Sequence, residues 1–88
     1  MHVTAPLSAL AQPTRLEILT AIAKAADGIS SSEIAKATGT PTNSTSAHLT
    51  VLRNAGLVVA TRDGRMINYR ARKDVLGKLA AFLGALAE

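Results

Sequence analysis

Short polar side chains crowd the stretch that begins at Thr40. Six of the seven residues in TPTNSTS, Thr40 to Ser46, carry a hydroxyl or amide group, and a leucine-spaced run follows up to Gly56. Side chains of this kind donate and accept hydrogen bonds at close range, which is the chemistry that reads base edges in the major groove of DNA. Asn43 suits adenine, and the Thr42 methyl group suits the methyl of thymine. The alternative is that Thr40, Thr42 and Asn43 only cap a helix and face solvent.

Basic residues concentrate in the second half of the chain. Six of them fall within 21 residues, where Asp63 is the only acid: Arg53, Arg62, Arg65, Arg70, Arg72 and Lys73. This window carries a formal charge of +5 and the rest of the chain −1, out of a total of +4. A local positive excess favours a polyanion as partner, although ordinary solvated charge gives the same pattern.

The sequence gives little support for disulfides, metal binding or catalysis. The chain has no cysteine, which excludes disulfides, thiolate metal sites and cysteine nucleophiles. Its only histidines are His2 and His48, fewer than the three or four ligands of a stable transition-metal site. We expect His48 to be packed and hydrogen-bonded on the inner face of a helix. The six carboxylates are scattered and the serine cluster at 30–32 lacks a histidine–acid partner, so we predict no enzyme, no metal site and no cofactor.

Helices must position most of these residues. A short helix is expected around 6–10 and a second over 13–25, with Pro13 in its first turn and Gly28 after its end. The second helix has a core face formed by Leu16, Leu19, Ile22 and Ala23.

A helix-turn-helix pattern follows. Ser30 and Glu33 have the spacing of a capping box, so a third helix should begin at about Ser31 and stop at Gly39. A fourth helix should be capped by Thr40, have Pro41 in its first position and end at residue 54 or 55. Its inner face is expected to hold Thr45, His48, Leu49 and Leu52.

The next segment, LVVATRDGRMINYRAR, alternates around Asp63-Gly64 and predicts a β-hairpin. If those two residues form the loop, Arg62 pairs with Arg65, Ala60 with Ile67 and Val58 with Tyr69. Val58, Ala60, Ile67 and Tyr69 then share an apolar face. Facing arginines cost stability unless something anionic meets them, which favours a functional role for the tip.

Size and composition favour a second copy of the chain as partner. A domain of 88 residues buries only a modest share of its surface, and aromatic residues make up just 2% of this chain. A final helix after Lys73 carries an apolar stripe that could complete the core or bind another subunit: Val75, Leu76, Leu79, Phe82, Leu83 and Leu86.

We find no signal peptide and no apolar run of about 18 residues, so a soluble cytoplasmic protein without membrane contact is expected.

In their order and residues, these elements resemble the ArsR family of winged helix-turn-helix transcriptional repressors. The matching pieces are LAQPTRLEIL, SEIAKATG, STSAHLTVLRNAGLV and TRDGRMINYR, and the resemblance spans about Leu7 to Leu86. The expected fold is mainly α with a small β-hairpin (α+β), a winged helix-turn-helix in the order α-α-α-α-β-β-α. Residues 1–88 would form a single DNA-binding domain whose terminal helices dimerise.

The resemblance implies a dimeric repressor that binds pseudo-palindromic double-stranded DNA. In helix-turn-helix proteins the first residues of the second helix meet base edges, which gives as base contacts Thr42, Asn43, Ser46 and Ala47. Contacts to the DNA backbone, including those of the wing, are expected from Ser44, Thr50, Arg53, Arg62 and Arg65. The homodimer contact is expected to include Leu7, Leu10, Leu79, Leu83 and Leu86. Arg15, in the motif PTR, is expected to be structural.

The resemblance also implies release of DNA by a signal. Many members of the family sense metals through cysteines or through histidines and acids on the last helix, yet SSSEIAKATG and FLGALAE contain neither cysteine nor histidine. A metal inducer is therefore not expected, and an effector would be an unidentified small molecule or protein. The alternative function is a winged-helix protein–protein interaction module. A helix that binds another protein should carry apolar or aromatic anchors at the positions of Thr42, Asn43 and Ser46. These three residues are polar, which favours DNA binding.

Overall fold

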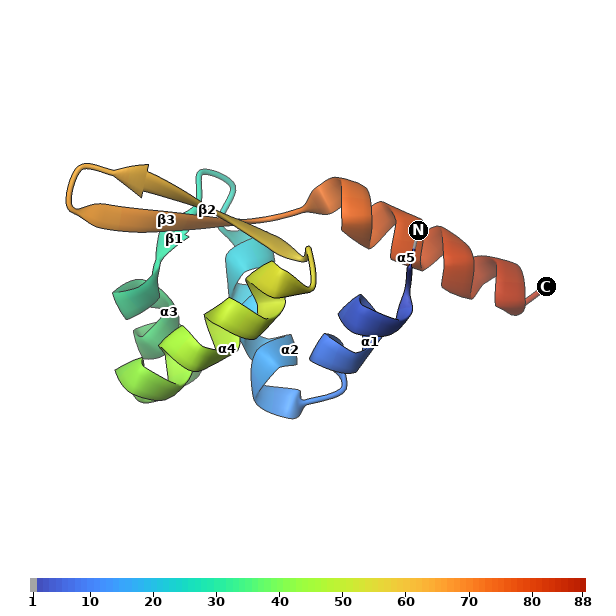
Figure 1. The fold of residues 1–88 in the computed structure, drawn as a ribbon, viewed down its shortest axis with the longest axis horizontal. Helices are drawn as coiled ribbons and strands as arrows, with labels where there is room; N and C mark the ends of the chain where they lie inside the picture. The colour runs from blue at the N-terminus through green and yellow to red at the C-terminus, as the bar shows by residue number, and fades with distance from the viewer. Residues whose placement is uncertain (1) are drawn as a thin grey trace.

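Five helices and three short strands make up residues 2–88, which the computed structural model describes (Figure 1). The helices are α1 (Thr4–Leu10), α2 (Pro13–Lys24), α3 (Ser31–Thr38), α4 (Thr42–Asn54) and α5 (Lys73–Leu86). The strands are β1 (Ile29–Ser30), β2 (Val58–Asp63) and β3 (Met66–Ala71). The predicted winged helix-turn-helix order is confirmed, and β1 is an addition that the sequence did not predict.

Caps fix the beginnings of α2 and α3. The Gln12 side chain accepts a hydrogen bond from the Arg15 backbone N–H (2.8 Å), and Pro13 takes the first position of α2. At α3 the Ser30 hydroxyl accepts from the Glu33 N–H and a Glu33 carboxylate oxygen accepts from the Ser30 N–H, both at 3.3 Å. Gly39 ends α3 with a φ of 67°. The predicted capping box and helix end are confirmed.

The predicted cap of α4 is wrong. Pro41 is the N-cap residue, and no side chain caps the helix. Thr40 lies one residue too early, and its hydroxyl is instead hydrogen-bonded to that of Thr38 (2.9 Å). The Thr45 hydroxyl donates to the Pro41 carbonyl at 3.0 Å, inside the first turn. The end of α4 at Asn54, before Gly56, is as predicted.

The hairpin is antiparallel, but its loop lies one residue later than predicted. Gly64 and Arg65 form the loop, and Gly64 has a φ of 64°, as the first central residue of a type II′ turn requires. Arg62 therefore pairs with Ile67, Ala60 with Tyr69 and Val58 with Ala71. The predicted Arg62–Arg65 pair does not form, so repulsion across such a pair gives no functional indication.

Aliphatic side chains from the helices and the base of the hairpin form the core. The members with the least exposure are Ile18, Ile22, Ile34, Leu49, Leu52, Leu57 and Val58. Leu19 and Ile22 are buried as predicted, whereas Leu16 is 49% exposed and Ile18 takes its place. The sheet, in the order β1-β3-β2, lies along one side of the α2–α4 bundle (Figure 1).

The molecule is elongated, with a longest extent of 45 Å. The hairpin tip and the beginning of α4 point toward one end, while α5 extends toward the other (Figure 1). Within residues 2–88, no helix has the length and apolar character that crossing a bilayer requires.

Candidate nucleic-acid interface

The first turns of α4 have one buried and one exposed side. Thr45 is fully buried and Leu49 is 1% exposed, because the helical period turns both toward the bundle. On either side of Thr45, the predicted base-contacting residues are exposed: Thr42, Asn43, Ser46 and Ala47. The helix therefore presents a continuous surface of small side chains to solvent.

The polar groups on this surface are free. In the part of the chain that the structure describes, the side chains of Thr42, Asn43 and Ser46 make no hydrogen bond to another protein group. No side chain caps α4, so the capping part of the alternative interpretation is not observed, whereas Thr42 and Asn43 do face solvent as that alternative predicted. Their donors and acceptors remain available to a ligand that approaches α4 from outside.

The predicted backbone-contacting residues of α4 lie beside this surface. Ser44 is half-buried, and the Thr50 hydroxyl donates to the Ser46 carbonyl at 3.1 Å, so its hydrogen is already used. Arg53 is exposed in the last turn of α4, where a positive charge also interacts favourably with the helix dipole.

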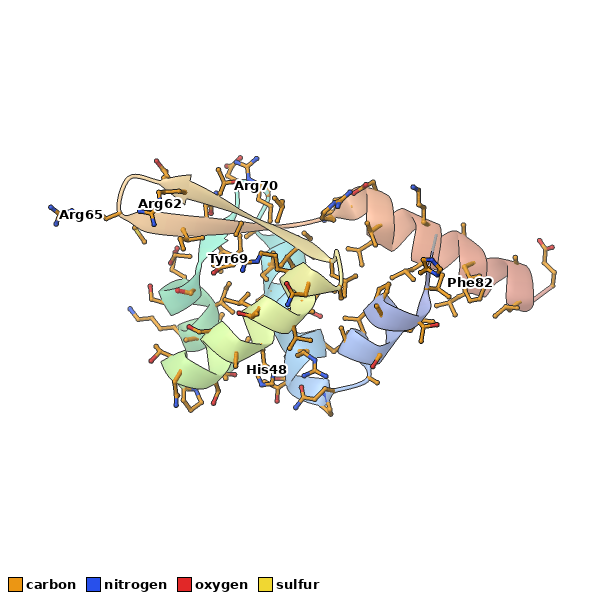
Figure 2. All side chains as sticks on the ribbon, in the orientation of Figure 1. His48, Arg62, Arg65, Tyr69, Arg70 and Phe82 are labelled. Atoms are coloured by element: carbon orange, nitrogen blue, oxygen red, sulfur yellow. The ribbon has the colours of Figure 1, made fainter. Side chains whose placement is uncertain are left out.

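Both arginines of the wing are exposed at the outer end of the hairpin (Figure 2). Arg65 lies in the turn, and Arg62 lies in β2 on the same sheet face as Ala60. Neither forms an ion pair among residues 2–88, although Asp63 lies between them in sequence. Their positive charges face solvent at the same end of the molecule as the beginning of α4.

The other members of the basic window bind their own chain. An Arg70 guanidinium N–H donates to the Asp27 carbonyl (3.2 Å), and the Lys73 ammonium group donates to the Ala23 carbonyl (3.0 Å). Arg72 forms a two-pronged pair with Asp74, with Nη2 2.8 Å and Nε 3.3 Å from the carboxylate oxygens. Hydrogen bonding by Arg72 lowers the pKa of Asp74. These three residues therefore have structural partners.

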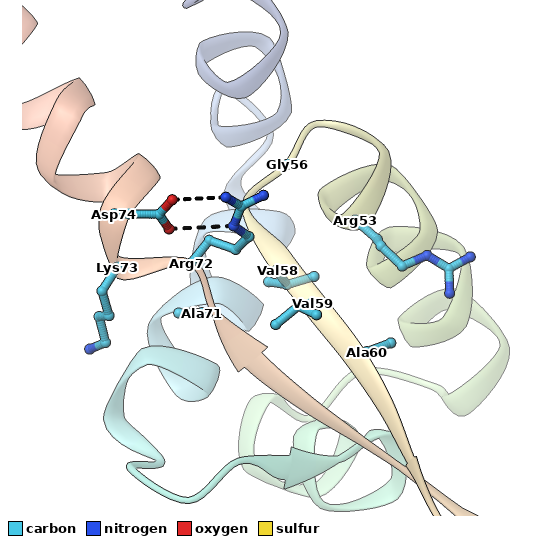
Figure 3. A pocket seen from close by; sticks show the side chains of 9 residues that line it. All are labelled: Arg53, Gly56, Val58, Val59, Ala60, Ala71, Arg72, Lys73 and Asp74. Carbon is cyan, nitrogen blue, oxygen red and sulfur yellow. Dashed lines mark hydrogen bonds and ion pairs between the residues drawn. The ribbon is translucent and has the colours of Figure 1, made fainter. Parts of the chain in front are cut away.

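An open groove separates Arg53 from the Arg72–Asp74 pair. Its floor is apolar and is formed by the base of the hairpin, including Val58, Val59 and Ala71. Figure 3 shows that Arg53 is directed away from the pair, toward the outer side of α4. The groove thus marks the boundary between basic residues that hold the fold together and those available for an anion.

Two further predicted positions are settled by geometry. His48 is half-buried on α4 (Figure 2). Its ring makes no hydrogen bond among residues 2–88, so the predicted hydrogen bond is absent. Those residues also hold no group of three or more His, Cys, Asp or Glu side chains that could bind a metal ion. Arg15 is structural, as predicted, because its Nε donates to the Ala9 carbonyl at 2.8 Å.

The residues predicted for a dimer contact fall into two groups. Leu7 and Leu10 are half-buried against the core, and Leu79 is only 4% exposed. Leu79 therefore belongs to the core of the single chain and has little surface to offer a partner. Leu83 and Leu86, at 50% and 69% exposed, remain open, as does Phe82 at 39%.

Sequence reasoning missed one contact beside the wing. The Asn68 side-chain amide donates to the Asp27 carbonyl at 3.0 Å, and Gly28 lies against that amide. No local signal could reveal this contact, because its two sides are 41 residues apart in the chain.

Known proteins resemble this chain in both sequence and structure. A family model described as a helix-turn-helix domain matches residues 10–60, more than half of the chain. The HTH-type transcriptional regulator CmtR of Mycobacterium tuberculosis is 40% identical over 81 residues, which cover 91% of this chain. The match spans 64% of the length of CmtR.

Solved structures agree with the sequence matches. An ArsR-like transcriptional regulator from Rhodococcus sp. RHA1 superimposes with a TM-score of 0.85 at 33% identity, covering 97% of this chain and 78% of that one. A homodimeric winged helix-turn-helix DNA-binding domain, Mb0332 from Mycobacterium bovis, gives 0.79 at 34% identity over 97% and 77%. These relatives are regulators and not enzymes. This chain belongs to the ArsR family of winged helix-turn-helix transcriptional regulators, which are DNA-binding proteins.

Proposed function

We propose that this protein is a dimeric repressor that binds a pseudo-palindromic DNA operator. The observation that carries the proposal is the free polar surface at the beginning of α4, which lies toward the same end of the molecule as the unpaired wing arginines (Figures 1 and 2). One surface supplies hydrogen-bonding groups without charge, and the other supplies charge at some distance from it. A DNA duplex offers matching features, namely base edges in a groove and phosphates along its rims.

Base readout is assigned to the exposed side of α4. Thr42, Asn43 and Ser46 are short, so their backbone can approach the floor of the major groove closely. Ala47 adds a methyl group that fits beside a thymine methyl. Because these side chains have no hydrogen-bonding partner within residues 2–88, they need not break an internal bond before binding a base.

Phosphate contact is assigned mainly to Arg62 and Arg65 of the wing, with further contacts from Ser44 and Arg53 on α4. Guanidinium groups bind phosphate through paired, charge-assisted hydrogen bonds. Uncompensated arginines at the end of a narrow hairpin can also follow the minor groove beside the site that α4 occupies.

Dimerisation is supported by the second half of α5. Every residue after Leu79 is exposed, including Phe82, Leu83 and Leu86. A helix whose apolar side has no partner is only marginally stable in water. A second copy would cover this side and would place two α4 helices on successive half-sites of a palindrome, about 34 Å apart.

The repressor role comes from the family resemblance, and its physical basis is exclusion. A dimer that occupies two half-sites within a promoter blocks other proteins from the same DNA. We propose that the inducing signal is an unidentified small molecule or protein and that DNA binding requires no metal, because residues 2–88 offer no cluster of metal ligands.

Titrations of two duplexes at several salt concentrations test the proposal. An operator is first selected from a pool of random duplexes, and a scrambled version serves as the reference. Asn43→Ala and Ser46→Ala should each lose preference for the operator, while binding to the scrambled duplex stays nearly unchanged. Full operator preference in Asn43→Ala would contradict the assignment of α4.

The wing is tested by replacing Arg62 and Arg65 together by Ala. Affinity for both duplexes should fall, and each lost phosphate contact should reduce the slope of log affinity against log salt by about 0.9 per subunit. Lys78→Ala, which removes one positive charge from the exposed side of α5, is the control for charge loss away from the wing and should keep the slope. An unchanged slope in the double variant would show that the wing arginines do not contact phosphates.

A further inference from the structure

A backbone carbonyl between α2 and β1 holds the wing. The Asp27 carbonyl accepts a hydrogen bond from the Asn68 side-chain amide at 3.0 Å and another from the Arg70 guanidinium at 3.2 Å. Both donors stand on β3, the central strand of the sheet. The contact therefore joins the helical bundle to the strand that leads into the wing tip.

The loop is shaped to admit Asn68. Gly28 has a φ of 93°, in the region that favours glycine, and a Cβ added there would overlap the Asn68 amide. Gly28 thus combines a backbone conformation that other residues rarely adopt with a space that the amide fills. The arrangement requires a particular residue on each of the two segments.

Few other bonds fix the hairpin to the bundle on this side. β1 is only two residues long, and its register pairs Ile29 with Tyr69 and Ser30 with Asn68. Asn68 therefore takes part in the last strand pair before the hairpin extends beyond β1. From Asn68 to the turn at Arg65 the strand runs about 10 Å, at about 3.3 Å per residue.

We propose that Asn68 is a positioning residue, which holds the wing at the angle where Arg62 and Arg65 reach the DNA backbone while α4 occupies the groove. The proposal rests on the phosphate contacts assigned to the wing above. A hairpin anchored near its middle acts as a lever, so a small rotation at Asn68 displaces the tip by ångströms. Loss of the Asn68–Asp27 bond would thus remove tip contacts without changing any charge.

The neutrality of Asn68 makes the inference testable. Arg70 binds the same carbonyl, but it carries a charge that could itself attract DNA, so a loss after its substitution would have two explanations. Asn68 has no charge. A change in salt dependence after its substitution must come from other residues that have lost their phosphates.

The test compares Asn68→Leu with Thr61→Val in the full chain. Leucine has the same branched arrangement of side-chain heavy atoms as asparagine but cannot donate to the Asp27 carbonyl. Thr61 is the β2 residue opposite Asn68, is exposed and makes no side-chain hydrogen bond within residues 2–88, so Thr61→Val is a matched control. Each substitution is made in the natural chain and in the Arg62→Ala/Arg65→Ala variant.

In the natural background, Asn68→Leu should weaken binding to a random duplex by about three- to tenfold and reduce the salt slope toward that of the wing double variant. In the wing double variant it should change neither quantity, because the contacts it misplaces are already gone. Thr61→Val should have little effect in either background. Asn68→Ala serves the same purpose if Asn68→Leu does not fold.

Failure of each proposal has its own signature. If the wing double variant keeps the natural salt slope, the phosphate contacts of the wing are refuted, and the positioning role with them. If the double variant lowers the slope but Asn68→Leu keeps it, or weakens binding equally in both backgrounds, only the positioning role is overturned.

Discussion

Arginines of one sequence window have different roles because different oxygens lie near them. Arg72 meets the carboxylate of Asp74 and Arg70 meets the carbonyl of Asp27, whereas Arg62 and Arg65 meet neither. The sequence predicted the excess of positive charge but not this division, since the carbonyl that binds Arg70 is 43 residues away; only the Arg72–Asp74 pair is local. It did predict which α4 side chains are exposed, because helical period alone decides that.

The Ser30–Glu33 capping box provides a prediction at this scale. Hydrogen bonds from the Ser30 hydroxyl and backbone N–H to the carboxylate lower the pKa of Glu33. Since the folded-state pKa lies below the unfolded-state pKa, the contribution to stability is complete above the latter and is lost as pH falls through the former. Glu33→Gln should therefore lower the free energy of unfolding at about pH 7 and have less effect toward about pH 3.

Urea denaturation over that pH range measures the effect. The same substitution in a Ser30→Ala background is the control, because it removes the hydroxyl that holds the carboxylate. An equal loss in both backgrounds, or a loss that grows on acidification, would contradict the assignment of the pKa shift to the capping box.

At the scale of elements, local signals predicted helices better than strands. Proline and glycine signals placed the start of α2 and the ends of α3 and α4 to within a residue. The hairpin was predicted, but Asp63-Gly64 and Gly64-Arg65 are both acceptable two-residue loops, and sequence could not choose between them. β1 has only two residues and exists because it pairs with β3, so no local pattern could indicate it.

Two glycines offer a paired prediction about elements. Gly64 has a φ of 64° in the hairpin turn, where an alanine is strained, so Gly64→Ala should lower the free energy of unfolding by about 1 kcal/mol. Gly77 lies inside α5, where a Cβ would meet nothing within 4 Å. Gly77→Ala should raise the free energy of unfolding by up to about 1 kcal/mol, because alanine is the better helix former.

Denaturant unfolding of the two variants under the same conditions measures both values. The chemical change is identical, so the opposite signs isolate the backbone conformation as the cause. A stabilising Gly64→Ala would show that the turn has a different geometry from the type II′ turn described.

At the scale of the whole molecule, the single chain leaves half of its last helix without support. The core ends at Leu79, and the apolar stripe continues along α5 through Phe82, Leu83 and Leu86. Sequence predicted this stripe from its period but could not divide it between the core and the outer surface, because the division depends on where α5 leaves the bundle. Leu79 was accordingly assigned to a dimer contact, whereas it lies in the core.

Dimerisation can be tested on that stripe. Leu83→Asp should shift a dimer toward monomer, since it would place a carboxylate in an apolar contact. Ala81→Asp puts the same group on the opposite, exposed side of α5 and should leave the dimer intact. Sedimentation at several concentrations measures both variants, and a natural chain that remains monomeric at high micromolar concentration would contradict the dimer.

The difference between the predicted and observed hairpin registers indicates which changes in the wing the fold allows. The two registers differ by an even step, so Val58, Ala60, Ile67 and Tyr69 share one sheet face in both. Hydrophobic patterning is therefore degenerate with respect to such slips, and the register is fixed at the base, where the Arg72 N–H donates to the carbonyl of fully buried Leu57 (2.8 Å). Residues around Gly64 can consequently be substituted, and the length and charge of the wing can change, without altering the packing of the core.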